Sequence, residues 1–508
     1  MRNYFKQYCA STSIHGFRYF GEDRSIFEKI WWFIAFVICL SGCGVMIFQI
    51  CEKYHNTPVI VTFATKETPL YKIPFPAITI CPEVKSVKRL LNFKDLILKQ
   101  NELNLTDAES KNLQYMTQLC ENPIGPLQVR NTILNDTFTN EFFETLDEVK
   151  VEPGFFKCSF LGQNIKNCED AFTPVFTDEG ICYSFNILDR GHIFNELVYH
   201  YENYHKVDKD TMSWNMERGY LDNSNIMTYP WRALLSGASN GFTVYLLVVV
   251  DNENIDFMCK QIQGYKVVLH SPVRMPRLNQ EYFRIPLDHA VVASVQPVVI
   301  TTSQEVKTFD VAKRNCYFPS ERKLKYFRTY SQQNCQFECL TNITLDSCGC
   351  VSFFMPRENS TKICGLGKYK CIKEAERALM LEELNKFRDS VKVEFVCLPL
   401  CTDLSYNIET SHTKWDWKKL VGLMVKSENL DDYETHASSL TVYFRVNHFI
   451  SSERHELYGL SDFMANFGGL LGLFTGFSIL SLMEVIYFLT VRICCNVRLY
   501  GRWRGVDN

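Results

Sequence analysis

The sequence predicts an α+β membrane protein in which two transmembrane helices flank a large, disulfide-rich extracellular domain. Two long apolar segments lie near the ends of the 508-residue chain, at residues 30–51 and 463–489. Fifteen of the 21 cysteines lie between them, as is typical of an oxidising compartment where bridges persist. Together these observations divide the chain into two tails, two spans and one extracellular domain.

The first span, residues 30–51, carries no charge and is long enough to cross about 30 Å of hydrocarbon. A signal peptide is the alternative, but the apolar stretch is too long and no small-residue cleavage site precedes Glu52. Basic residues precede the span and follow the second one. Residues 1–29 and 490–508 are therefore expected to be cytoplasmic tails.

Residues 52–462 are then the extracellular domain, and four glycosylation sequons fall inside it, at Asn104, Asn135, Asn342 and Asn359. Its clustered cysteines lack the paired C-x2-C sets of zinc sites, so we expect disulfides. Periodicity predicts a set of elements: strands at 59–63, 72–81, 242–250 and 440–446, and helices at 84–103 and 372–391. The first and last strands connect directly to the two spans.

The second span, residues 463–489, contains polar and small residues that an anchor does not need. Gly468, Gly472 and Gly476 recur every fourth residue, which lets transmembrane backbones approach closely. Asn466 and Glu484 are 18 residues apart, about five turns of a continuous helix, and would share one face. A carboxylate inside a span usually faces water or a partner, which indicates an ion-conducting pore; an anchor whose Glu484 snorkels to the interface stays open.

Other functions find little support in the sequence. The net charge of −3 does not indicate a nucleic-acid partner. No phosphate loop, metalloprotease motif or nucleophile elbow is present, so we expect neither an enzyme nor a cofactor or metal site. Isolated His192, His270 and His289 are interpreted as ordinary loop or core residues.

Five short strings occur in order around the two spans: SIHGFRY at 13–19, FPAITIC at 75–81, YSQQNCQFEC at 330–339, CLPLC at 397–401 and GFS at 476–478. In these strings the chain resembles the degenerin and epithelial sodium channel superfamily, most closely its insect pickpocket branch. The resemblance implies a trimeric channel at the plasma membrane, with a central β-sheet palm and helical thumb and finger elements. It also implies voltage-independent, amiloride-sensitive conduction of sodium ions in a homotrimer or a heterotrimer of related subunits.

The resemblance assigns roles to single residues. His15 and Gly16 match the cytoplasmic gating motif, and Gly476, Phe477 and Ser478 the selectivity filter. Pore and gate roles fall to residues of the second span: Ala465, Asn466, Gly469, Gly472 and Glu484. Ala465 matches the site where bulky substitutions hold degenerins open. The middle filter residue is usually small in this superfamily, so Phe477 is a departure. We expect the helix to be interrupted at the filter and Phe477 to pack between subunits.

The resemblance also implies six disulfides: Cys81–Cys182, Cys158–Cys168, Cys316–Cys401, Cys335–Cys397, Cys348–Cys371 and Cys350–Cys364. Cys120, Cys259 and Cys339 are left over. The family often has one more cysteine where this chain has Phe395, so Cys339 lacks its usual partner, and a Cys120–Cys259 bridge is a guess.

Three functions stay open on the sequence. The first is a channel subunit gated by an extracellular stimulus, which the sequence does not identify. The second is a non-conducting modulatory or receptor subunit in which Phe477 impairs conduction. The third, a scavenger-like receptor or ecto-enzyme with two anchors, needs no polar stripe in the second span. Asp431, Asp432 and Glu434 would form a proton sensor only if they pair; a solvated loop is the alternative.

Overall fold

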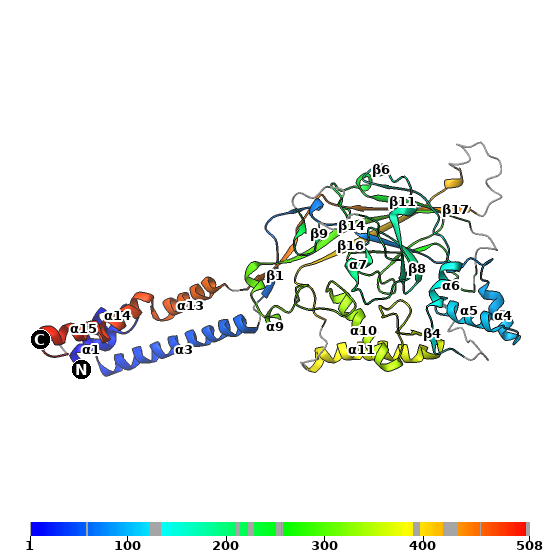
Figure 1. Ribbon diagram of the computed structural model, residues 1–508. Coiled ribbons are helices and arrows are strands. Elements are labelled where there is room, and N and C mark those ends of the chain that lie inside the picture. Colours follow the sequence, from blue (N-terminus) through cyan, green and yellow to red (C-terminus); the bar gives the residue numbers. More distant parts are fainter. Residues whose placement is uncertain are drawn as a thin grey trace. The chain divides into compact units, whose positions relative to one another are not determined.

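The computed structural model describes residues 2–56, 59–120, 134–209, 214–221, 228–249, 256, 258–389, 397–419, 435–457 and 459–503 (Figure 1). The chain forms two compact units. The first comprises Met1–Thr62, Ser303–Arg314 and Arg454–Asn508, and the second Phe63–Thr302 and Asn315–Glu453.

The first unit is mainly helical. Its helices are α1 (Arg2–Ser11), α2 (Arg18–Gly21), α3 (Ile26–Asn56), α8 (Gln304–Lys307), α9 (Val311–Arg314), α13 (Leu460–Thr475), α14 (Ile479–Leu489) and α15 (Val491–Tyr500). Within the described residues, α3 and the stretch Ile479–Tyr500 are long and apolar enough to cross a membrane. Helix α3 packs against α13 through Tyr54 and Phe463, whose ring centroids are 5.2 Å apart. Strands β1 (Val59–Phe63) and β19 (Ser452–Glu456) are neighbours next to these helices.

The second unit is built on two sheets. The larger has the order β14-β17-β11-β5-β6, with β16 also paired to β14. Its strands are β14 (His289–Thr302), β17 (Thr435–Phe444), β11 (Phe242–Val249), β5 (Phe155–Phe160), β6 (Gln163–Asn164) and β16 (Asp403–Lys414). Strands β14 and β17 run parallel, and the other pairs are antiparallel. The strand predicted at 242–250 is present as β11, and its alternate residues Phe242, Val244 and Leu246 lie in the core.

The smaller sheet has the order β13-β12-β3-β8-β7. Its strands are β13 (Phe283–Ile285), β12 (Tyr265–His270), β3 (Ala77–Pro82), β8 (Gly180–Phe185) and β7 (Phe172–Thr177). Every residue of β3 is buried, as expected for a strand covered on both faces. Aromatic rings join the two sheets: Phe155 stacks on Phe172 with centroids 3.9 Å apart, and Phe185 on Phe242 at 4.0 Å.

Three helices with a separate aromatic core lie beside the sheets: α4 (Phe93–Asn101), α5 (Asp107–Thr117) and α6 (Glu141–Val149). The helix expected at 84–103 is shorter than predicted. It begins at Phe93 because Asn92 caps it, its side chain accepting the Asp95 N–H at 3.2 Å. The segment before Asn92 contains turns, and the N–H of Val87 donates to the Val149 carbonyl instead.

Helices α10 (Gln332–Cys348) and α11 (Tyr369–Asp389) form the stapled helical part of the unit. Ser331 caps α10 by accepting the Asn334 N–H at 3.0 Å, and Gly349 ends it in a left-handed conformation with φ +72°. Helix α11 contains most of the amphipathic helix predicted for 372–391; Val391 lies outside the described residues.

Short elements complete the second unit. They are β2 (Thr68–Pro69) with β18 (His448–Phe449), β4 (Thr137–Phe138) with β15 (Ile363–Cys364), β9 (Trp214–Asn215) with β10 (Gly219–Tyr220), the helix α7 (Arg190–Ile193), and the 3-10 turns Leu70–Lys72, Glu169–Ala171, Ala238–Asn240 and Leu366–Lys368.

Seven disulfides join the described residues of the second unit: Cys81–Cys182, Cys120–Cys259, Cys158–Cys168, Cys316–Cys401, Cys335–Cys397, Cys348–Cys371 and Cys350–Cys364. These include the six pairs that the resemblance implies and the guessed Cys120–Cys259. Cys339 takes part in none of these seven bridges.

Candidate functional site

The second apolar segment is broken at the three residues expected to form a filter. Helix α13 ends at Thr475 and α14 begins at Ile479. Gly476 ends α13 in a left-handed conformation with φ +66°, which glycine adopts without steric cost. Ser478 is extended and caps α14, accepting the Ser481 N–H at 3.2 Å. The predicted interruption is therefore present, and Phe477 is half-buried within the single chain.

Asn466 and Glu484 were expected to share one face of a continuous helix. The two residues instead lie on separate helices, α13 and α14. The left-handed Gly476 and the extended Ser478 redirect the backbone between them. A shared face therefore does not follow from their spacing.

The His15-Gly16 segment lies directly against the break. The N–H of His15 donates to the Thr475 carbonyl at 2.9 Å. A Cβ built on Gly476 would lie 2.7 Å from the His15 ring. Gly16 itself has φ +86° and allows the tight turn between α1 and α2. The expected gating motif and the expected filter thus share a direct contact.

A second contact joins the same N-terminal segment to α14. The N–H of Ser13 donates to Glu484 Oε2 at 3.1 Å, and the Ser13 and Ser481 hydroxyls are 2.7 Å apart. Ser481 is fully buried. The carboxylate of Glu484 therefore binds the segment before His15 and does not extend away from the helix alone.

Helix α1 anchors this segment further along α14. The hydroxyl of Tyr4 donates to the Phe488 carbonyl at 2.5 Å, and the Tyr8 and Phe488 rings are 5.3 Å apart. The N-terminal residues therefore contact α14 at both its ends.

Ala465, Asn466, Gly469 and Gly472 lie on α13. Ala465 and Asn466 are exposed in the single chain, and the Asn466 side chain donates to the Asp462 carbonyl at 2.9 Å. A Cβ on Gly469 or Gly472 would meet nothing within 4 Å. This face of α13 is therefore open to a further helix.

Comparison with known proteins identifies the family. Residues 8–488 match the family described as amiloride-sensitive sodium channel. The chain belongs to this family. It is 27% identical to pickpocket protein 28 of Drosophila melanogaster over 97% of this chain and 79% of that protein. It is 23% identical to sodium channel protein Nach of Drosophila melanogaster, over 98% and 89% of the two chains. Identity to acid-sensing ion channel 1C of Danio rerio is 22%, over 95% and 82%.

Within this sodium channel family, the chain has two membrane-spanning helices and a disulfide-rich mixed-sheet domain between them. The family consists of ion channels and not of enzymes. The sequence analysis assigned roles to His15, Gly16 and the filter residues, but none to Ser13 or Ser481. The spacing Ser478-x-x-Ser481 at a helix start was a usable signal for Ser481. Ser13 is the first residue of the string at 13–19, but its contact with α14 has no local signal.

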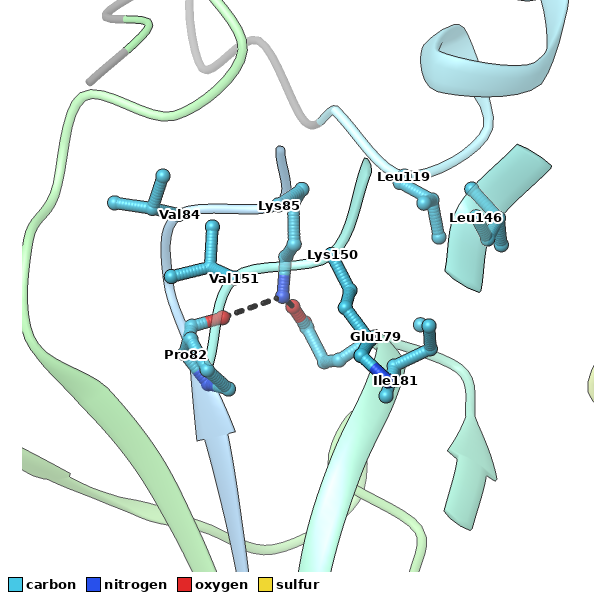
Figure 2. A pocket seen from close by; sticks show the side chains of 10 residues that line it. Pro82, Val84, Lys85, Leu119, Leu146, Lys150, Val151, Glu179 and Ile181 are labelled. Atoms are coloured by element: carbon cyan, nitrogen blue, oxygen red, sulfur yellow. Dashed lines mark hydrogen bonds and ion pairs between the residues drawn. The ribbon is translucent and has the colours of Figure 1, made fainter. Parts of the chain in front are cut away.

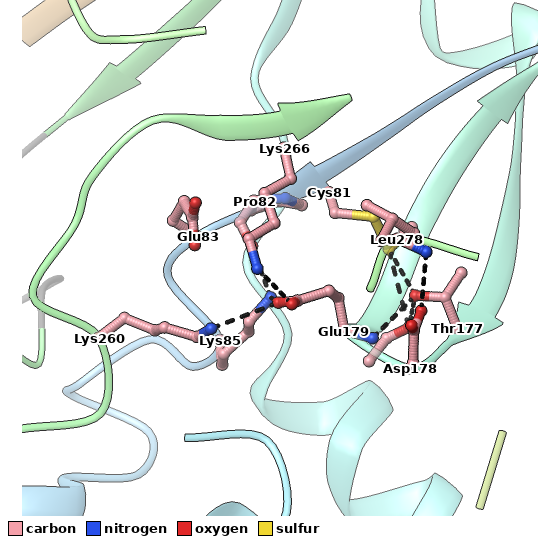
Figure 3. A network of polar contacts seen from close by, with 12 residues as sticks. Cys81, Pro82, Glu83, Lys85, Thr177, Asp178, Glu179, Lys260, Lys266 and Leu278 are labelled. Carbon is pink, nitrogen blue, oxygen red and sulfur yellow. Dashed lines mark hydrogen bonds and ion pairs between the residues drawn. A yellow bond between two sulfur atoms is a disulfide. The ribbon is translucent and has the colours of Figure 1, made fainter. Parts of the chain in front are cut away.

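The second unit holds a buried ionic cluster at the turn between β7 and β8 (Figure 3). Lys85 Nζ lies 2.9 Å and Lys260 Nζ 3.4 Å from Glu179 Oε2, and Lys266 pairs with Oε1. Side-chain exposure is 8% or less for all four residues. Burial alone would raise the pKa of the Glu179 carboxyl, but the ammonium groups of Lys85 and Lys260 hold it well below its usual range.

The cluster is structural in character. The cavity beside Lys85 and Glu179 has a volume of only about 20 Å³ (Figure 2), which is room for about one water molecule. The cluster therefore joins the turn between β7 and β8 to β12 and to the segment after β3.

The remaining expected residues are distributed over the second unit. Of the sequon asparagines, Asn104, Asn135 and Asn359 are exposed. Asn342 is half-buried on α10, and Thr344 of its sequon is fully buried, so it is the poorest candidate for glycosylation. Asp431, Asp432 and Glu434 lie outside the described residues.

Proposed function

We propose that this chain is a pore-forming subunit of a voltage-independent, amiloride-sensitive sodium channel, gated by an extracellular stimulus. Three copies, identical or from related subunits, would surround the pathway in the plasma membrane, with both termini cytoplasmic. The proposal rests on the break at Gly476–Ser478. Next to it the His15 N–H binds the Thr475 carbonyl, and Ser478 caps α14. In the span predicted at 463–489 the break would lie at membrane depth, where irregular backbone is tolerated if it is buried in protein or lines a water-filled path.

The break supplies the chemistry that a filter needs. Backbone carbonyls released from helical bonding, together with the Ser478 hydroxyl, would replace part of the water shell of a sodium ion. The open face of α13, with Ala465, Asn466, Gly469 and Gly472, would approach the equivalent helices of the other subunits.

Gating would act through the hydrogen bonds between the N-terminal segment and the two helices on either side of the break. Because the His15 N–H binds the Thr475 carbonyl and the Ser13 N–H binds Glu484, movement of the N-terminal segment would act on the end of α13 and on the middle of α14. At the opposite ends of the proposed spans, β1 follows α3 and β19 precedes α13, and the two strands are neighbours in one sheet. A shift of this strand pair would reach both spans at once.

The second candidate is a non-conducting modulatory or receptor subunit. Phe477 favours it, because a phenyl ring at the middle filter position can obstruct the pathway unless it packs between subunits. Partner subunits would then supply the pore.

The test is whole-cell current from this chain expressed alone, with and without Ala465→Val to hold the gate open. A pore-forming subunit gives a current that falls when sodium is replaced and that amiloride blocks. Surface labelling of both forms is the control. Silence of both forms at normal surface levels would overturn self-sufficient conduction, and recovery by Phe477→Ala would then assign the block to that ring.

A further inference from the structure

The second unit contains a second cavity, and its lining residues are of the kind found in ligand-binding sites. Its volume is about 50 Å³, several times the 10–15 Å³ that about one water requires. Aromatic side chains from α6, β7 and the loops around them form most of its surface, among them Phe143, Phe176, Phe194, Tyr199, Phe353 and Phe354. Asp and Glu are absent from its lining residues as described.

Arg357 lines this cavity and is only 3% exposed. Its guanidinium lies 4.6 Å from the centroid of the Tyr199 ring and 5.5 Å from that of Phe143. It donates to the Thr361 carbonyl at 2.8 Å, to the Glu358 carbonyl at 3.3 Å, and to Asn140 Oδ1. These are all neutral acceptors.

Across the described residues, Arg357 forms no ion pair with a carboxylate within 4.0 Å. The adjacent carboxylate of Glu358 is engaged by Lys325, whose Nζ lies 3.0 Å away. Buried charges in proteins are usually paired, and the lysines around Glu179 follow that rule. The positive charge of Arg357 therefore lies beside an apolar cavity, and none of the described lining residues supplies an opposite charge to pair with it.

His205 adds a second polar group to the same cavity. It is 6% exposed, and its Nδ1 is buried with no hydrogen-bond partner among the described residues. Its backbone is fixed in a left-handed conformation, φ +60°, by bonds from its N–H to Pro174 and from Arg190 to its carbonyl. In the tautomer that carries its proton on Nδ1, this ring has a buried N–H ready to donate.

We propose that this cavity binds a small monocarboxylate with an apolar body, its carboxylate paired with Arg357 and its body against the aromatic walls. The free energy cost of desolvating the guanidinium is already included in folding, so the ligand loses only its own hydration. A cationic ligand would be repelled by Arg357, and a neutral one would leave the charge unpaired. The site is extracellular in the proposed topology, but its binding does not depend on conduction.

The test uses the purified full-length chain in detergent, with acetate as probe, because a two-carbon carboxylate matches a cavity of about 50 Å³, and acetamide as its neutral analogue of the same shape. Saturation-transfer NMR titrations measure both affinities. We expect acetate to saturate and to bind about tenfold more tightly than acetamide, as a charge-assisted pair would give. Equal affinities, or no saturable binding of acetate, would overturn the proposal.

A matched pair of variants locates the site. Arg357→Gln should weaken acetate binding about tenfold and leave acetamide binding unchanged. Arg277→Gln is the control, because Arg277 is also a partly buried arginine over a ring, 4.4 Å from the Phe337 centroid, but it does not line this cavity. Equal loss in both variants would place binding elsewhere and contradict the assignment. If Arg357→Gln does not fold, the comparison of acetate with acetamide on the unmodified chain still tests the proposal.

Discussion

At the residue scale, Gly476 is the position on which the candidate pore depends most. Its φ of +66° is costly for any residue with a Cβ, by about 1–2 kcal/mol. In addition, a Cβ there would lie 2.7 Å from the His15 ring. Both effects act on the contact between the N-terminal segment and the break.

Gly476→Ala should therefore reduce sodium current about tenfold at unchanged surface expression, since about 1.4 kcal/mol corresponds to that factor. Gly44→Ala is the matched control, because a Cβ on that glycine of α3 meets nothing within 4 Å. Currents are compared in the Ala465→Val background. Normal current from Gly476→Ala would contradict the role given to the left-handed break.

Glu179 is the residue that holds the ionic cluster together. Glu179→Gln would leave Lys85, Lys260 and Lys266 buried without this carboxylate, and breaking a buried pair in this way costs about 3–5 kcal/mol. We expect a clear fall in the thermal unfolding midpoint of the full-length chain. Glu141→Gln, which removes an exposed pair with Lys111, should change the free energy of unfolding by at most about 0.5 kcal/mol. A similar small effect of both changes would show that the cluster is not a stabilising centre.

Motifs predicted His15, Gly16 and Gly476 but could not predict their contacts. Ser13 and Ser481 meet across a sequence separation of 468 residues, and local patterns carry no information on such pairs. The prediction that Asn466 and Glu484 share a face depended on a continuous helix. One left-handed glycine, Gly476, is enough to end that helix.

At the element scale, the disulfides fix α10 and α11 at several points. Cys335–Cys397 closes a sequence separation of 62 residues at the start of α10, whereas Cys158–Cys168 closes 10 residues beside β5. Bridges that close longer loops remove more entropy from the unfolded chain.

Replacing Cys335 and Cys397 together by serine should therefore lower the free energy of unfolding by about 4 kcal/mol, against about 3 kcal/mol for Cys158 and Cys168. The readout is the thermal unfolding midpoint and surface expression of the full-length chain. A larger loss from the short bridge would contradict the loop-length argument.

Periodicity predicted β1, β11 and most of α11 correctly. The strand predicted at 440–446 covers only the second half of β17, and the expectation that it connects directly to the second span was wrong, because β18 and β19 lie between β17 and α13. It did not predict the long pair of β14 and β16 or the parallel pairing of β14 with β17, because their partners are chosen by the tertiary fold. The helix expected at 84–103 was too long, since the cap at Asn92 outweighs the apolar pattern before it.

At the scale of the whole molecule, stability should depend on acid through buried histidines. Burial lowers the pKa of His200 to about 4 and that of His205 to about 3, both below their ordinary value. The unfolded chain therefore binds protons at higher pH than the folded chain. Stability is full above pH about 6.5 and falls as the pH drops from there toward 4.

His205→Asn should flatten this decline by about 1 kcal/mol per pH unit, because asparagine does not titrate and tolerates the left-handed backbone at this position. Thermal midpoints of the full-length chain between pH 7 and pH 4 provide the measurement. His448→Asn, at an exposed position, is the control. An unchanged slope in His205→Asn would contradict the assignment to this ring.

In the proposed function this chain itself lines the conduction path at the break between α13 and α14. To test this, a positively charged methanethiosulfonate reagent is added to cells expressing Ser478→Cys in the Ala465→Val background. We expect irreversible loss of the sodium current, while the Ala465→Val parent keeps its current. An unchanged current in channels shown to be labelled at position 478 would contradict it.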